Sequence, residues 1–94
     1  MRCCILGEVR AFDAEGRPLD LGGRRQRMVL AVLLLHAGAP VTVEGLIAGV
    51  WGEQPPPSAR KTLQVYIARL RRLLGSDVLT AAPGGYRLHL GADE

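Results

Sequence analysis

The stretch PSARKTLQVYIARLRRLL, residues 57–74, organises the rest of the chain. Its apolar residues recur at intervals of three and four, which is the spacing of one face of an α-helix. The members of this apolar stripe are Ala59, Leu63, Ile67, Leu70 and Leu74. The spacing predicts a helix that buries the stripe against a core and turns its other side outward.

The outer side of this predicted helix is basic, and the stretch contains no acidic residue. It is formed by Lys61, Val65, Ala68 and Arg72, with Gln64 and Arg69 at its flanks. Positive charge mixed with small apolar groups suits the major groove of DNA, where basic residues meet phosphates or guanine and apolar groups meet thymine methyls. A charged helix face is commonly only solvated, so a plain surface helix is the alternative.

Composition indicates a small globular domain. The 94 residues are enough for one core, and 48% hydrophobic with only 4% aromatic residues predicts a mostly aliphatic core. The net charge of +3 permits a polyanionic partner without requiring one. We expect one domain over residues 1–94, with a sheet in 2–21, a helical core in 24–74 and a hairpin in 77–90.

Cysteine and histidine are too few for a disulfide framework or a metal site. Cys3 and Cys4 are adjacent, so a disulfide between them would be strained, and the chain has no other cysteine. Only His36 and His89 could add ligands, so no zinc site of the usual spacing exists. The apolar run at 29–35 is too short to span a bilayer. We expect a cytoplasmic protein with free thiols and no metal, cofactor or membrane partner.

Three helices are predicted in the middle of the chain. Residues 24–37 predict a first helix that is apolar nearly all round and therefore central. Residues 43–50 predict a second helix, with Thr42 as a candidate N-cap. Pro57 is expected to open the third helix at its first turn, and Gly75 to end it.

Strands are predicted on both sides of the helices. Residues 2–12 predict one strand, or two short ones bent at Gly7, and residues 17–21 predict a partner strand. Near the other end, the β-type runs 78–82 and 86–90 predict a hairpin. The order of elements is that of an α+β winged helix-turn-helix, in which the third helix enters the major groove and the hairpin is the wing.

Three segments then carry a family resemblance: LGGRRQRMVLAVLLLHAG (21–38), VWGEQPPPSARKTLQVYIARLRRLLG (50–75) and TAAPGGYRL (80–88). They resemble the DNA-binding domain of OmpR/PhoB-type response regulators, and more closely that of the SARP/AfsR group, the Streptomyces antibiotic regulatory proteins. The resemblance implies an amino-terminal four-stranded sheet, a three-helix core and a carboxy-terminal hairpin. It also implies a sequence-specific transcription factor, usually an activator, that binds direct repeats in double-stranded promoter DNA as head-to-tail protomers.

The resemblance also implies roles for single residues. The base-reading positions are Lys61, Gln64, Val65 and Arg69. The phosphate-contacting positions are Trp51, Tyr66, Arg71, Thr80 and Tyr86. The loop that would face RNA polymerase, including its sigma subunit, is Gly52, Glu53, Gln54, Pro55, Pro56 and Pro57. From their charge alone, Arg60, Arg72 and Arg87 are expected to add phosphate contacts.

Two positions depart from the family pattern. Many relatives have a basic residue at the position of Ala68, and a wing arginine that enters the minor groove at the position of Ala82. Specificity is therefore expected to come from the helix. For two aromatic residues, packing is the alternative to contact with phosphate. Tyr66 could be a core aromatic with its hydroxyl at the surface, and Trp51 could anchor the second helix by packing.

Arginines also gather at the start of the first predicted helix, as Arg24, Arg25 and Arg27. Positive charge there is unfavourable to the helix dipole, so an outside partner is conceivable for at least one of them, namely a phosphate or a second protomer. Simple solvation is the alternative.

No residue pattern indicates catalysis. The sequence has no Ser/His/Asp or Cys/His arrangement linked to a plausible pocket and no paired carboxylates at useful spacing, so we do not expect an enzyme. The alternative function is a protein–protein interaction module in which the basic helix and the proline loop dock an acidic partner, because fold does not fix function.

Overall fold

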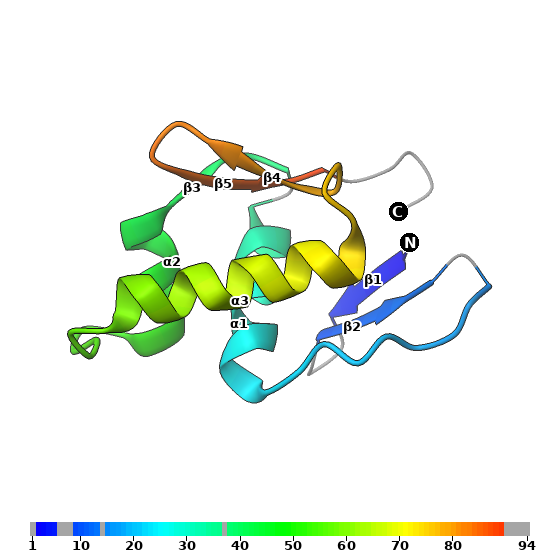
Figure 1. The fold of residues 1–94 in the computed structure, drawn as a ribbon, viewed down its shortest axis with the longest axis horizontal. Coiled ribbons are helices and arrows are strands. Elements are labelled where there is room, and N and C mark those ends of the chain that lie inside the picture. Colours follow the sequence, from blue (N-terminus) through cyan, green and yellow to red (C-terminus); the bar gives the residue numbers. More distant parts are fainter. Residues whose placement is uncertain (1, 6–8, 14, 37, 90–94) are drawn as a thin grey trace.

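A computed structural model describes residues 2–5, 9–13, 15–36 and 38–89. The elements are β1 (Arg2–Ile5), β2 (Val9–Phe12), α1 (Arg24–Leu35), β3 (Val41–Thr42), α2 (Val43–Trp51), α3 (Ala59–Leu74), β4 (Leu79–Ala82) and β5 (Gly85–Leu88). In Figure 1, α3 crosses in front of α1, with β3, β5 and β4 along one side and β1 and β2 beyond its carboxy-terminal end. This is the α+β winged helix-turn-helix that the sequence predicts.

Helix α1 is central, as its nearly all-round apolar character predicts. It contacts α2, α3, β2 and β5. Val29, Leu30 and Leu33 are completely buried in it, whereas Leu35 in its last turn is 74% exposed. Because α2, α3, β2 and β5 all rest on α1, this helix fixes where α3 lies.

Helix α3 is held by the apolar stripe that its spacing predicts. All five stripe residues are buried: Ala59, Leu63, Ile67, Leu70 and Leu74. The helix ends before Gly75, whose φ of 111° is a conformation that favours glycine. Burial of one side leaves the opposite side of α3 free to meet a partner.

The predicted start of α3 at Pro57 is wrong. The helix begins at Ala59, with Ser58 as its N-cap. The Ala59 N–H instead donates to the Pro56 carbonyl oxygen at 3.0 Å, which closes a turn in which Pro57 and Ser58 are the central residues. Ser58 has φ −86° and ψ 6°, the values of the third residue of a type I turn, and proline is favoured just before it. Pro57 therefore shapes the turn that leads into the helix.

The amino-terminal sheet is smaller than the family resemblance implies. Among the described residues β1 pairs only with β2, and the predicted strand over 17–21 is reduced to a single bridge between Phe12 and Pro18. The Asp13 carboxylate accepts the N–H groups of Glu15 and Arg17 at 3.0 and 2.9 Å, which curls the chain into a turn. Proline has no N–H to donate to a ladder. The four-stranded expectation is therefore wrong for the described residues.

The wing is a three-stranded sheet in the order β3–β5–β4, so it holds one strand more than the predicted hairpin. Val41 pairs with Tyr86, and Thr42 pairs with Gly85. A Cβ atom on Gly85 would lie only 1.9 Å from the Val41 carbonyl oxygen, so only glycine permits this pairing. Because β3 runs directly into α2, the sheet ties the wing to the helical core.

Some expectations fall outside the described residues. A bend at Gly7 and the end of the hairpin at Leu90 are among them, and the side chains of Cys3 and Cys4 are not described, although their backbone lies in β1. Across the described ranges, no helix combines the length and apolar character needed to cross a bilayer. The same ranges contain no group of three or more His, Cys, Asp or Glu side chains arranged to hold a metal ion.

Candidate nucleic-acid interface

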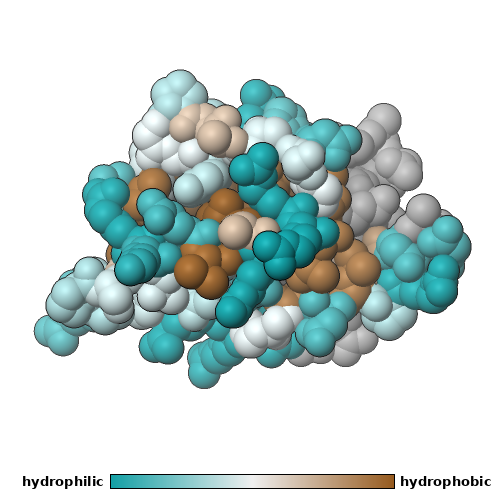
Figure 2. Space-filling view, in the orientation of Figure 1, coloured by the Kyte–Doolittle hydropathy of each residue, from teal (hydrophilic) through white to brown (hydrophobic). Residues whose placement is uncertain are grey.

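The four predicted base-reading residues lie on the outer side of α3, and we call these four residues the outer face of α3. Its four members are all exposed: Lys61, Gln64, Val65 and Arg69. Val65 is 42% exposed, so a β-branched apolar side chain lies among cationic ones. Figure 2, which views the molecule with α3 in front, shows hydrophilic side chains interrupted by apolar surface. This arrangement offers both charge and methyl groups to a groove.

Tyr66 combines the two roles that the sequence leaves open. It is half-buried against the core cluster, and its ring stacks on that of Trp51 with a centroid distance of 6.2 Å and an interplanar angle of 16°. Stacking of this kind adds to the energy of apolar burial. Trp51, at the end of α2, is likewise half-buried. Its stacking on Tyr66 joins α2 to α3. Packing is thus shown for both aromatic residues, and contact with phosphate remains a prediction.

Arg60, an expected phosphate contact, has a protein partner in this structure. Its Nη2 atom donates to the Glu44 Oε1 atom at 2.6 Å, which links the first turn of α3 to the first turn of α2. The pKa of the Glu44 carboxyl is lowered, first by a hydrogen bond from its own backbone N–H and then by the hydrogen bond and charge of Arg60. Arg60 can reach phosphate only by sharing or leaving this ion pair.

The expected contacts on the wing are also partly engaged. Arg87 Nε donates to the Gly38 carbonyl oxygen at 2.6 Å, and Thr80 Oγ1 lies 2.7 Å from His89 Nε2 in a hydrogen bond. Tyr86 is half-buried and packs against the core cluster. These side chains are oriented by the protein, with the remaining guanidinium nitrogens of Arg87 available to an anion.

The other expected contact residues are open to solvent. Arg71 and Arg72 are exposed in the last turn of α3, where positive charge also suits the carboxy-terminal end of the helix dipole. The loop expected to face a polymerase is exposed at every position: Gly52, Glu53, Gln54, Pro55, Pro56 and Pro57. Gly52 ends α2 with φ 76°.

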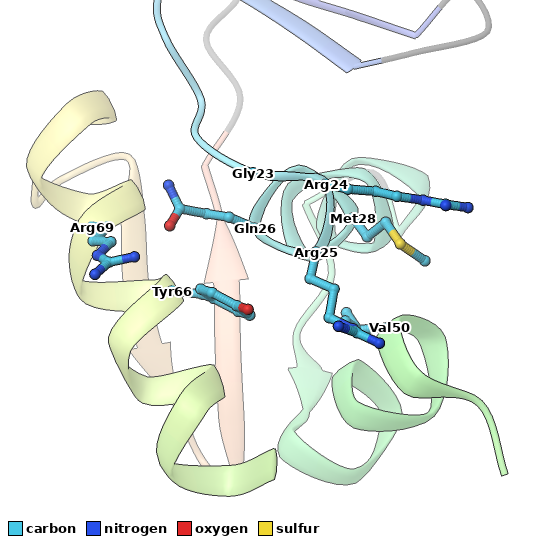
Figure 3. A pocket seen from close by; sticks show the side chains of 8 residues that line it. All are labelled: Gly23, Arg24, Arg25, Gln26, Met28, Val50, Tyr66 and Arg69. Atoms are coloured by element: carbon cyan, nitrogen blue, oxygen red, sulfur yellow. The ribbon is translucent and has the colours of Figure 1, made fainter. Parts of the chain in front are cut away.

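A concave site of about 590 Å³ lies beside the outer face of α3, between α1, α2 and α3. We call it the α1–α3 cleft, and its lining residues are Gly23, Arg24, Arg25, Gln26, Met28, Val50, Tyr66 and Arg69. Figure 3 shows Arg25 extending from α1 toward Val50 and Tyr66 reaching across from α3, whereas Arg24 extends away from α3. The sequence does not predict that these segments meet.

Gln26 is a structural residue of this cleft that the sequence analysis does not single out. It is 4% exposed, and its Nε2 atom donates to the Leu21 carbonyl oxygen at 2.8 Å. This bond fixes the chain just before α1, and thereby the position of Arg25. Gln26 lies three and four residues before Val29 and Leu30, so helical periodicity places it on the buried side of α1.

The chain is similar to proteins of known families. Residues 16–88 match the family described as "Transcriptional regulatory protein, C terminal". The chain is 41% identical to the regulatory protein AfsR of Streptomyces griseus over 94% of its own length and 9% of AfsR. It is 43% identical to the regulatory protein DnrI of Streptomyces peucetius, over 94% of its own length and 36% of DnrI.

A solved structure is also similar. It is that of Mycobacterium tuberculosis EmbR in complex with a low-affinity phosphopeptide, with a TM-score of 0.76 and 40% sequence identity. The match covers 84% of this chain and 22% of the EmbR chain. The chain thus spans only about a tenth to a third of the length of these similar proteins.

Proposed function

The chain belongs to the family of carboxy-terminal domains of transcriptional regulatory proteins and is a DNA-binding domain of OmpR/PhoB and SARP type, and we propose that it reads promoter DNA mainly through α3. Its relatives AfsR and DnrI are regulatory proteins by name. The observation that carries the proposal is the outer face of α3, which is exposed, basic and partly apolar on a helix whose opposite side is fully buried.

The division of labour on α3 follows side-chain chemistry. Gln64 suits bidentate pairing with adenine, Arg69 suits guanine, and Val65 suits contact with a thymine methyl. Lys61 completes this base-reading set. Arg60, Arg71 and Arg72 would neutralise phosphates regardless of sequence, supported by wing contacts from Thr80, Tyr86 and Arg87 and by Trp51 and Tyr66.

Further partners are proposed from the family resemblance. The protein would act as an activator that binds direct repeats with a second protomer alongside the first. The exposed loop Gly52, Glu53, Gln54, Pro55, Pro56 and Pro57 would face RNA polymerase, including the sigma subunit. A domain that binds promoter DNA in a bacterial regulator would work in the cytoplasm.

The test compares a specific and a random duplex. A duplex selected from a random DNA pool is titrated with wild-type protein, Arg69→Ala and Arg72→Ala at several salt concentrations. Arg69→Ala should lose about 1–3 kcal/mol of binding free energy on the selected duplex and relax the base preference at one or two positions of the site. Arg72→Ala should weaken binding to both duplexes alike and reduce the slope of log affinity against log salt concentration by about one. Equal losses on both duplexes from both variants would exclude base reading by Arg69.

The same titration distinguishes DNA binding from the rival function, which is docking of an acidic protein partner. The exposed proline loop and basic helix favour it as a second candidate. Absence of any DNA binding by the wild-type protein at micromolar concentration would favour this rival.

A further inference from the structure

We propose that the α1–α3 cleft extends the DNA-binding surface to α1: Arg25 joins Tyr66 in holding one backbone phosphate of the strand bordering the groove that Arg69 reads. The inference rests on the proposed function and extends it from α3 to α1. It gives Arg25, in the first turn of α1, a role that neither the family resemblance nor the comparisons assign.

The lining of the α1–α3 cleft is positively charged. The cleft lining contains Arg24, Arg25 and Arg69 and no acidic residue. Within the described part of the chain, none of these three side chains has a hydrogen-bonding or ion-pair partner. Arginines gathered around one concavity raise the potential there and favour an anion. A phosphate oxygen is the acceptor that a guanidinium fork binds best.

The placement of these charges also costs stability. The first turn of α1 contains no acidic residue, and its N-cap Gly23 makes no side-chain capping bond. Cations near a helix amino terminus oppose the helix dipole, whose positive end lies there. A bound phosphate would reverse this penalty, because its negative charge is favourable at that end of the helix. The anion would therefore stabilise α1 while it fixes the DNA.

Geometry selects Arg25 and Tyr66 within the cleft. Arg25 lies between α1 and Val50, with Tyr66 reaching toward it from α3, whereas Arg24 extends away from α3 (Figure 3). Tyr66 is held in place by its stacking on Trp51. A rigid hydroxyl opposite a guanidinium provides two kinds of donor to one phosphate without further ordering of the aromatic ring.

The cleft adjoins the outer face of α3, because Arg69 belongs to both. The major groove is about 12 Å wide, so a helix lying in it brings neighbouring elements against the flanking backbone. Contacts to phosphate set the register of a protein on the duplex, whereas contacts to bases provide specificity. One phosphate held beside Arg69 would therefore fix the position from which Arg69 reads.

The test uses Arg25→Ala, with Arg24→Ala as the matched control, since it removes the same charge from the neighbouring residue in the same turn. On the selected duplex, Arg25→Ala should weaken binding about fivefold and lower the salt slope by about 0.9, the value for one lost phosphate. The random duplex should lose affinity to a similar extent. Arg24→Ala should change affinity clearly less. Equal effects of the two variants would overturn the assignment to Arg25, because they would indicate diffuse charge.

A neutral methylphosphonate placed at successive backbone positions locates the phosphate. At one position flanking the α3 site it should weaken wild-type binding about fivefold and should weaken Arg25→Ala no further. If every position affects both proteins alike, the cleft holds no phosphate of DNA. Saturable binding of inorganic phosphate at the cleft, seen by NMR and lost in Arg25→Ala while DNA affinity is unchanged, would instead indicate a small-anion site.

These outcomes are separate from those of the proposed function. Loss of specificity in Arg69→Ala with full affinity in Arg25→Ala would leave the α3 proposal intact and overturn only the cleft. A wild-type protein that does not bind DNA would overturn both.

Discussion

At the scale of single residues, the ion pair between Glu44 and Arg60 connects the two helices of the helix-turn-helix. The Glu44 side chain is 69% exposed and that of Arg60 is 64% exposed. Solvent screens such pairs strongly, so the pair contributes little to global stability. Its role is to orient Arg60 at the start of α3.

This pair predicts a pH-dependent effect of Glu44→Gln. The pKa of Glu44 is lowered in the folded protein, so its stabilising effect is complete above the usual Glu value of about 4.3 and is lost as pH falls through the folded value. Glu44→Gln should therefore have a slightly lower Tm than the wild-type protein at neutral pH, because the pair is exposed, and an equal Tm in strongly acidic buffer. Thermal unfolding followed by circular dichroism measures both, with Glu53→Gln in the exposed loop as a control. An unchanged Tm at neutral pH would contradict the prediction.

At the scale of elements, the pairing of β3 with β5 depends on Gly85, which lies within a strand. In the hairpin the turn is made by Pro83 and Gly84, and only Gly84 of the two glycines has a positive φ, 74°. Gly85 has a different task, close approach to the β3 backbone. The same dipeptide thus serves a turn and a sheet.

Gly85→Ala is accordingly expected to destabilise the wing. The new Cβ atom would meet the backbone of Val41 and Thr42, which cannot move without disturbing the start of α2. We expect a loss of about 1–3 kcal/mol in the free energy of unfolding, measured by urea titration. Ala81→Ser, an exposed change in β4, should stay within about 0.5 kcal/mol. A Gly85→Ala variant as stable as this control would show that the strands do not approach so closely.

The sequence predicts elements wherever one local pattern dominates. Periodicity alone identifies the buried side of α3, from Ala59 to Leu74, and the central position of α1. It does not predict β3, because two residues such as Val41 and Thr42 carry no period and gain their strand geometry only from pairing with β5. The strand over 17–21 is overpredicted because the hydrogen bonds of Asp13 compete with a ladder.

Some features of the candidate site follow from a local sequence pattern, and others do not. The exposure of Lys61, Gln64, Val65 and Arg69 follows from the helical period, since these residues lie away from the buried stripe. The ion pair of Arg60 with Glu44 joins residues of two helices, and the α1–α3 cleft joins residues of three elements. Such contacts depend on how the helices cross, which no local pattern in this sequence specifies.

At the scale of the whole molecule, size sets how protomers could line up on DNA. The principal dimensions are 39 × 26 × 22 Å, and the longest is close to one turn of B-DNA, about 34 Å. A protomer whose longest dimension lay along the duplex would cover roughly one turn. Two protomers bound to direct repeats would therefore lie on one side of the duplex when the repeats are about 10–11 base pairs apart.

The spacing of the repeats should therefore control cooperative binding. Insertion of about five base pairs between two half-sites would rotate the second protomer to the opposite side of the duplex and abolish cooperativity. Insertion of about ten should place both on the same side again, with weaker contact. Quantitative gel-shift titration measures this, with a single half-site as the reference. Cooperativity that does not depend on spacing would argue against adjacent protomers.

The stacking of Trp51 on Tyr66 gives the whole domain an optical property. Trp51 is the only tryptophan in the chain, so its fluorescence arises from one position, at the junction of α2 and α3. Emission from that indole depends on its water exposure and on its neighbouring ring, both of which change when α3 separates from α2. The unmodified protein therefore contains a spectroscopic probe at the element proposed to meet DNA, and no dye is needed to follow that helix during binding or unfolding.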